Sequence, residues 1–120
     1  MTDVLDMTVI EELLSLSDDG DPELLLDLIG MFLADGPTKL SSIVEGLGSG
    51  DLEQIERAAH SLKGSSGNLG ARRLQYACEE MQVASRGHDM STTKQLAPQM
   101  SACFDEARRA LETIRQRYAH

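Results

Sequence analysis

Residues 51–69 read DLEQIERAAHSLKGSSGNL, and their small and apolar residues recur every three or four positions, as on one face of an α-helix. At about 100° per residue, one arc of the helical wheel holds Leu52, Ile55, Ala59, Leu62, Ser66 and Leu69. Asp51 is a suitable N-cap for this helix, and Gly70 is a natural stop after it. The stretch predicts an amphipathic helix whose stripe faces a helical core.

The same helical pattern extends outward in both directions. No segment of four or more residues alternates cleanly between polar and apolar side chains, and β-branched residues are few. The predicted elements are a short N-terminal helix over about 8–16, opened by a capping box of Thr8 and Glu11, and long helices over about 22–47, 51–69, 71–86 and 91–118.

Four long helices joined by short turns favour antiparallel neighbours. We therefore predict an all-α fold, an antiparallel up-down-up-down four-helix bundle, with the short additional N-terminal helix packed over one end. Residues 1–120 are expected to form a single domain, because this length suffices for one core. Pro37 is expected to end or kink its helix, and Pro98 to kink the last helix or delay its start. Met31, Met81 and Met100 lie at helical spacing and are expected to fill the core.

The chain is acidic, with 20 Asp and Glu against 11 Lys and Arg and a formal net charge of −9. Residues 1–56 hold 14 acids and one base, a net of −13, whereas residues 57–120 hold 6 acids and 10 bases, a net of +4. Because an acidic surface repels phosphate backbones and anionic lipid, we expect neither nucleic acid nor a membrane as a partner.

Cys78 and Cys103 lack metal-type spacing and sit in apolar helical segments, which predicts two buried thiols in a reducing compartment and no metal site. No stretch approaches the roughly 18 apolar residues of a membrane span, and the acidic N-terminus lacks the basic start of a signal peptide. We expect a cytoplasmic monomer.

One position on the helix over 51–69 faces away from the predicted core. His60 lies about 140° from the centre of the apolar arc, with Gly64 and Gly67 on the same face and Lys63 and Arg57 beside it. Each glycine inside a helix costs about 1 kcal/mol relative to alanine, and core packing does not require one on a solvent face. The bare backbone predicts close approach by another protein, and the two cations would hold an anion there.

A solvent-facing histidine suits nucleophilic chemistry on that anion, because a neutral imidazole nitrogen attacks phosphorus near neutral pH. Attack on an acyl phosphate or on the γ-phosphate of ATP would give a phosphoramidate on His60. An antiparallel turn near Gly70 would bring Gln82 to the level of His60, where its amide can hydrogen-bond the imidazole. The chain itself has no P-loop, since GSSGNLG at 64–70 follows no predicted strand and lacks the required Gly-Lys-Ser/Thr order.

Residues 59–74, AHSLKGSSGNLGARRL, closely resemble the signature of histidine-containing phosphotransfer (HPt) domains of bacterial-type two-component phosphorelays. That signature is roughly His-x-Leu-Lys-Gly-small-small-x-x-apolar-Gly. The matching residues are His60, Leu62, Lys63, Gly64, Ser65, Ser66, Leu69 and Gly70. The resemblance also covers the preceding helices and the total length, and thus most of the chain.

The resemblance implies that His60 accepts the phosphoryl group, that Lys63 lies near the phosphate and that Gly64 makes room for a receiver domain. Some members place a glutamine at the position of Gln82. It also implies a sensor or hybrid histidine kinase and a response-regulator receiver as partners, no cofactor of the chain's own, and Mg²⁺ on the receiver only. Val9 and Leu13 are expected to contribute to the docking surface.

These features predict a phosphorelay intermediate, a phosphoryl carrier on His60 rather than an enzyme. One alternative is a helical adaptor that docks a receiver without transferring phosphate. A second is an HPt fragment of a larger hybrid kinase, although the initiating Met and the polar C-terminus favour a free-standing chain.

Overall fold

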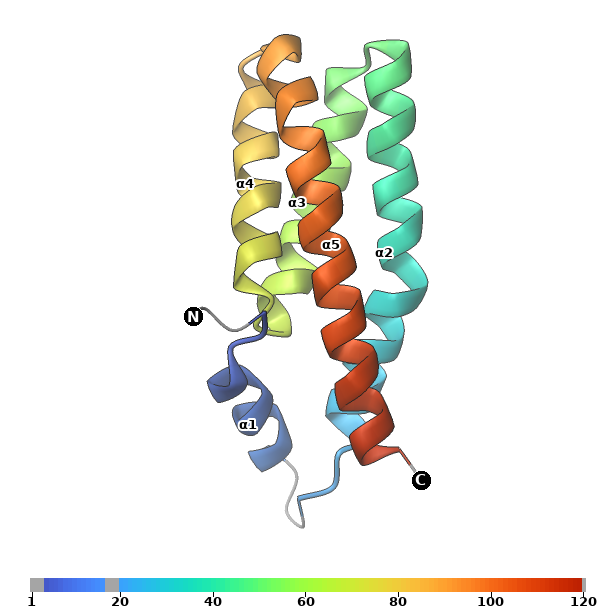
Figure 1. Cartoon of the computed structure of the whole chain (residues 1–120), viewed down its shortest axis with the longest axis vertical. Helices are drawn as coiled ribbons and strands as arrows, with labels where there is room; N and C mark the ends of the chain where they lie inside the picture. The colour runs from blue at the N-terminus through green and yellow to red at the C-terminus, as the bar shows by residue number, and fades with distance from the viewer. Residues whose placement is uncertain (1–3, 17–19, 120) are drawn as a thin grey trace.

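The computed structural model describes residues 4–16 and 20–119 (Figure 1). Within them the chain forms helices only: α1 (Met7–Ser15), α2 (Glu23–Ser49), α3 (Leu52–Asn68), α4 (Arg72–Arg86) and α5 (Met90–Tyr118). The prediction of an all-α fold is therefore confirmed.

Helices α2 to α5 form the bundle, each antiparallel to the next and joined to it by a turn of a few residues (Figure 1). Consecutive helices pack against each other, and α5 closes the ring against α2. The α3–α4 hairpin is shorter than α2 and α5, and α1 packs against α2 beyond its turn. Helix α1 thus lies below the α3–α4 turn in Figure 1, alongside the part of α2 that extends past the hairpin.

The core is aliphatic, as the scarcity of aromatic residues requires. Its largest fully buried apolar side chains are Ile10, Leu25, Ile29, Ile43, Ile55, Leu62, Leu69, Leu74, Met81, Met100 and Leu111. Phe32 and Phe104 stack within it at a ring-centroid distance of 5.6 Å. Full burial of one such side chain contributes about 1.5–3 kcal/mol, so the apolar stripes hold the four helices together.

Carboxylates cap most of the helix starts. Asp51 accepts a hydrogen bond from the Gln54 N–H at 3.0 Å, as predicted. At α1 the predicted capping box of Thr8 and Glu11 is wrong: the helix starts earlier, at Met7, and the Asp6 carboxylate accepts from the Thr8 N–H at 3.0 Å. A carboxylate at this position also interacts favourably with the positive end of the helix dipole.

Both internal prolines lie within continuous helices. Helix α2 runs through Pro37 and α5 through Pro98, so neither a helix end at Pro37 nor a late start at Pro98 occurs. Both prolines are exposed. The carbonyl that each leaves without an N–H partner can therefore bind water, which lets packing on the opposite face override the local penalty.

Both cysteines are free thiols in the interior between α4 and α5, which confirms the prediction that they are buried. Burial raises the pKa of the Cys78 thiol to about 12. Because the thiolate is the reactive form, Cys78 is inert near neutral pH. In the described ranges, no helix is both long and apolar enough to cross a membrane.

Candidate functional site

His60 is exposed on the outer face of α3. The opposite face of the same helix is the predicted stripe, with Ile55, Ala59 and Leu62 fully buried. Ser66 is buried in that stripe, and its hydroxyl donates to the Leu62 carbonyl at 2.8 Å, so it carries no unpaired polar group into the core. The packing of α3 therefore fixes the direction in which His60 points.

Gln82 of α4 reaches this imidazole. Its side chain is only 5% exposed, and its Nε2 lies 3.1 Å from His60 Nδ1. The short α3–α4 turn sets the register, because Gly70 takes a left-handed φ of +76° and ends the first helix sharply. The contact occupies Nδ1 and leaves Nε2 as the ring nitrogen free to meet a reacting group.

The amide of Gln82 can serve either tautomer of the ring, since rotation by 180° exchanges its N–H donors for its oxygen acceptor. When the oxygen faces Nδ1, Nδ1–H donates to it and the proton is held there. Nε2 then carries its lone pair outward, which is the form of the ring that a nucleophile needs.

A shallow hollow beside His60 is lined by Glu56, Arg57, His60, Gln82 and Arg86. Arg86 Nε donates to Glu56 Oε1 at 2.9 Å and bridges α4 to α3. Arg57 is exposed and has no ion-pair partner among the residues that the structure describes. The hollow therefore offers one free and one paired guanidinium to an anion on the imidazole.

Glu56 and Arg86 line the hollow but are not among the site residues predicted from the sequence. Glu56 precedes His60 by four residues and Arg86 follows Gln82 by four, so each shares a helix face with the residue that was identified. The spacing of four residues could have indicated both positions. It does not show that the face of α3 with Glu56 lies opposite the face of α4 with Arg86, which the structure shows.

Lys63 is half-buried and lies on the side of α3 that faces α4. Its charge acts on Cys78 of α4 and opposes the rise in thiol pKa that burial causes. Lys63 is thus one turn from His60, on the side of the helix that Gln82 also approaches.

The two glycines of this face have different surroundings. A Cβ on Gly64 would meet nothing within 4 Å, so the backbone there is open, as expected. A Cβ on Gly67 would lie 2.9 Å from the amide nitrogen of Gln75. Arg72 donates a hydrogen bond of 3.1 Å to the amide oxygen of the same side chain. The expectation that Gly67 is a bare position is therefore wrong, because a side chain of α4 covers it.

A groove of about 130 Å³ lies between α2 and α3, on the side of α3 that faces α2. Helix α3 contributes Ser61, Ser65 and Asn68, and helix α2 contributes Leu28 and Met31. Met31 is 60% exposed, so the prediction that it fills the core is wrong. Met81 and Met100, by contrast, are fully buried.

Val9 and Leu13 of α1 line neither depression beside His60. Both are half-buried, and Val9 packs at the α3–α4 turn, with its Cβ 3.1 Å from where a Cβ on Gly70 would lie. That turn is ten residues, or about 15 Å, along α3 from the imidazole. Across the described ranges, no group of three or more His, Cys, Asp or Glu side chains is placed to hold a metal ion.

Residues 27–117 match the model of the Hpt domain family. The chain is 34% identical over 70 residues to histidine-containing phosphotransfer protein 2 of Arabidopsis thaliana, a match that covers 56% of this chain and 45% of the relative. It is 30% identical over 86 residues to the phosphorelay intermediate protein YPD1 of Saccharomyces cerevisiae, covering 71% and 51%. The chain thus spans about half the length of these curated relatives.

A solved structure matches over nearly the whole length of both chains. The crystal structure of histidine-containing phosphotransfer protein B (HptB) from Pseudomonas aeruginosa superimposes with a TM-score of 0.87 at 30% identity, covering 98% of this chain and 99% of that one. A histidine-containing phosphotransfer protein from rice has a TM-score of 0.79 at 19% identity, a likeness of fold alone.

Proposed function

Because the chain belongs to the Hpt domain family, we propose that it carries a phosphoryl group on His60, from a sensor or hybrid histidine kinase or a receiver domain to the receiver domain of a response regulator. Phosphorelay intermediates of this family are carriers rather than enzymes. We also propose that this chain has no ATP site of its own and that it acts as a monomer in the cytoplasm.

The observation that carries the proposal is the pairing of an exposed imidazole with a buried amide. Gln82 lies 3.1 Å from Nδ1 and is itself 5% exposed, so it orients the ring from the interior. Nε2 is the ring nitrogen that this contact leaves free, and Gly64, one turn further along α3, has an open backbone. This is the arrangement that an incoming phosphoryl group needs, because phosphoryl transfer depends mainly on positioning and charge stabilisation.

In the proposed step, the Nε2 lone pair attacks the phosphorus of an aspartyl phosphate on the receiver. The N–P bond forms as the P–O bond to the aspartate breaks, and the carboxylate leaves with the bonding electron pair. The Nδ1 proton stays on the ring, held by the Gln82 oxygen. Reversal of the same step delivers the group to the next receiver. Mg²⁺ bound by the receiver would supply neutralisation of the phosphoryl oxygens during the transfer.

Three cations of the chain surround the position of the phosphoryl group. Lys63 lies one turn from His60, and Arg57 and Arg86 line the adjoining hollow. A phosphoryl group on Nε2 competes with Glu56 for Arg86, which now donates to that carboxylate at 2.9 Å. We propose that Arg86 exchanges between these two acceptors as the group arrives and leaves.

The receiver docks on the face that contains Gly64 and the groove between α2 and α3. Met31 is exposed there, and Leu28 is half-buried beside it, which gives the groove an apolar edge next to the phosphorylation site. Gly64 lies between this edge and the hollow that holds Arg57 and Arg86, so a docked receiver meets backbone rather than a side chain at its closest approach.

The test is transfer from a phosphorylated receiver domain carrying radioactive phosphate. Wild type should take up the label as an acid-labile, alkali-stable adduct, which separates phosphohistidine from phosphoserine at Ser61 or Ser65. His60→Gln should take up none. His88→Asn is a matched control, because His88 is also exposed and its φ of +59° suits asparagine. Equal labelling of His60→Gln and wild type would contradict the proposal.

The two alternatives give different results in the same experiment. A non-transferring adaptor binds the receiver, detected by calorimetry, but wild type and His60→Gln both stay unlabelled. An HPt fragment of a larger kinase takes up the label as the isolated chain does. The sequence of the complete gene then decides between a free-standing protein and a fragment.

A further inference from the structure

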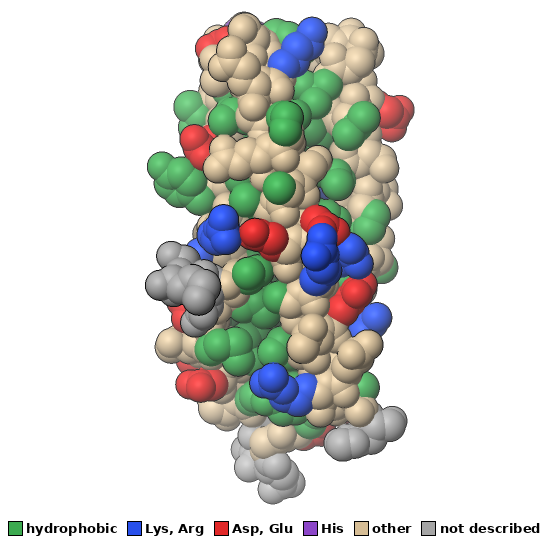
Figure 2. Space-filling view, viewed as in Figure 1, with side chains coloured by type: hydrophobic (Ala, Val, Ile, Leu, Met, Phe, Trp, Pro, Cys, Tyr) green, Lys and Arg blue, Asp and Glu red, His purple; other side chains and the backbone are tan. Residues whose placement is uncertain are grey.

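A third depression lies between α4 and α5, on a side of α4 that does not face His60. It has a volume of about 600 Å³ and is lined by Tyr76 and Val83 on α4, by Gly87 just after α4, and by Leu96 on α5. Figure 2 looks onto these two helices and shows hydrophobic side chains gathered over their upper half, with acidic side chains among them. We call this depression the α4–α5 groove.

Its apolar residues are unusually open to solvent. Tyr76 is 64% exposed and Val83 is 63% exposed, and they lie seven residues apart on one face of α4. Leu96 is half-buried on the facing helix. Large apolar side chains that line up along a groove mark an interaction site more often than isolated ones do.

The acidic residues of the groove lack cationic partners. Glu79 and Glu80 line it, and neither has an ion-pair partner within 4.0 Å in residues 4–16 and 20–119. Elsewhere on these helices the carboxylates of Glu106 and Glu112 are paired with arginines. Asp89, which caps α5, adds a third negative charge at one end of the groove.

From this combination we propose that the α4–α5 groove binds a basic amphipathic helix of a partner protein. The groove extends from Tyr76 to Gly87, the C-cap of α4, a distance of eleven residues or about 16 Å, which matches three turns of a docked helix. Leucine-like side chains of that helix cover Tyr76, Val83 and Leu96, and its lysines or arginines pair with Glu79 and Glu80. Apolar anchors with complementary rim charges are the usual chemistry of such grooves.

The position of the groove allows a partner to bind there while His60 stays accessible. On α4, Val83 lies about 100° around the helix from Gln82, which is turned toward His60. A helix seated between α4 and α5 therefore leaves the imidazole on α3 uncovered. A partner can hold the chain there while a second protein reaches His60, and the binding itself does not depend on phosphotransfer.

The first test uses the full chain and a synthetic 15-residue helix with leucine at every third or fourth position and lysine elsewhere. Amide chemical shifts should change at Tyr76, Val83 and Leu96 and stay unchanged at His60 and Gly64. Val83→Ser should weaken binding about tenfold. Val44→Ser is the matched control, because Val44 is 59% exposed on α2, outside the groove, and it should change binding less than twofold.

A second pair of variants separates the groove from the overall acidity of the chain. Glu79→Gln with Glu80→Gln should weaken binding several-fold. Glu11→Gln with Glu12→Gln removes the same charge from adjacent exposed residues of α1 and should have little effect. Equal losses in both pairs, or shift changes centred elsewhere, would overturn the proposal.

Sedimentation equilibrium tests the remaining occupant, a second copy of this chain. Wild type should stay monomeric at the concentrations used for binding. Self-association that Val83→Ser abolishes would show that the groove binds another copy, and would overturn the assignment to a basic helix. Val83→Ser should take up label from a phosphorylated receiver as wild type does, so the outcome at the groove is independent of the outcome at His60.

Discussion

Gln82 is one of the few polar side chains in the interior of this bundle, and its amide meets the imidazole of His60. A buried amide without a hydrogen-bond partner costs about 1–3 kcal/mol. The contact therefore stabilises the packing of α4 against α3 at the same time as it orients the ring. At the scale of single residues, stability and the proposed function depend here on the same hydrogen bond.

At Gly64, an effect on stability can be measured separately from an effect on phosphoryl transfer. Nothing within 4 Å would meet a Cβ at this position, so Gly64→Ala should raise the free energy of unfolding by about 0.5–1 kcal/mol through better helix propensity. The longer side chain of Gly64→Gln should still permit folding but slow phosphoryl transfer from a receiver by tenfold or more. Thermal unfolding and single-turnover transfer measure the two effects.

Gly30→Ala is the control for that substitution, since a Cβ on Gly30 of α2 would also meet open space. It should stabilise the chain to a similar extent and leave transfer unchanged. A Gly64→Gln variant that transfers at the wild-type rate would show that the bare backbone is not needed for docking.

At the scale of helices, Gly46 sets how closely α2 approaches α3. A Cβ there would lie 2.6 Å from Ile55 Cγ1 and 3.1 Å from the Asp51 carbonyl oxygen. Gly46→Ala should therefore lower the free energy of unfolding by about 1–3 kcal/mol, despite the higher helix propensity of alanine. Gly48→Ala, two residues further on with nothing within 4 Å, should be neutral or slightly stabilising. Urea unfolding measures both, and equal effects would contradict the close approach.

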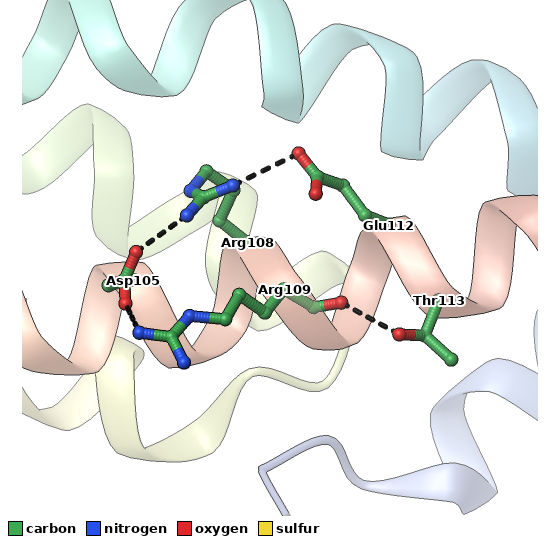
Figure 3. Close-up of polar contacts among 5 residues, drawn as sticks. All are labelled: Asp105, Arg108, Arg109, Glu112 and Thr113. Atoms are coloured by element: carbon green, nitrogen blue, oxygen red, sulfur yellow. Dashed lines mark hydrogen bonds and ion pairs between the residues drawn. The ribbon is translucent and has the colours of Figure 1, made fainter.

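The C-terminal half of α5 carries its own charge network (Figure 3). The Asp105 carboxylate accepts hydrogen bonds from Arg108, at 2.7 Å, and from Arg109. Arg108 also donates to Glu112 at 3.2 Å, four residues further along the helix. The hydrogen bonds from Arg108 and Arg109 hold the pKa of Asp105 below its ordinary value.

This network predicts a pH-dependent contribution to stability. Because the pKa of Asp105 is lower in the folded state, its contribution is fully present above the unfolded-state value of about 3.9 and is lost as the pH falls through the folded-state value. Asp105→Asn should lower the urea midpoint at pH 7, and the difference from wild type should shrink below about pH 4. In a background of Arg108→Gln and Arg109→Gln that shrinkage should disappear. Its persistence there would mean that the arginines are not its cause.

At the scale of the whole molecule, the acidic and basic parts of the chain meet in α3. The acids of residues 1–56 belong mainly to α1, α2 and the start of α3, and the bases begin at Arg57, which lines the hollow beside His60. Net charge alone opposes the approach of any acidic partner. In the proposed function, attraction for a phosphoryl group is therefore local, and we expect it to come from Arg57, Lys63 and Arg86.

Besides its packing against α2, α1 is attached to the bundle at the α3–α4 turn. The Asp6 N–H donates to the Gly70 carbonyl at 2.8 Å, and a Cβ on Gly70 would lie 2.8 Å from the Asp6 carbonyl oxygen. Gly70→Ala should cost about 1–2 kcal/mol for the left-handed backbone, and further stability as Leu5 and Ile10 lose their packing.

Gly50→Ala isolates the backbone part of that cost. Gly50 has a φ of +75°, close to that of Gly70, but a Cβ there would meet nothing within 4 Å. Gly70→Ala should lower the free energy of unfolding more than Gly50→Ala does. The larger loss should be accompanied by faster hydrogen exchange at the Asp6 amide. Equal losses in the two variants would show that the contact between α1 and the turn contributes nothing.

The helices and the direction of His60 can be predicted from the amino-acid order alone, because both follow from a period of about 100° per residue and from capping residues close by in the chain. The position of Gln82 can be predicted in the same way, since a short turn fixes the register of two antiparallel helices. These are local constraints, and the structure agrees with them at the stripe of α3 and at the contact between Gln82 and His60.

Which helix faces meet cannot be predicted in this way and is seen in the folded bundle. Several features depend on how each helix is rotated about its own axis against its neighbours. They are the ion pair of Glu56 with Arg86, the contact of Gln75 over Gly67, the exposure of Met31 and the α4–α5 groove. Spacing along one helix does not set that rotation. It is set by the summed packing of side chains from several helices at once, which is a property of the whole core.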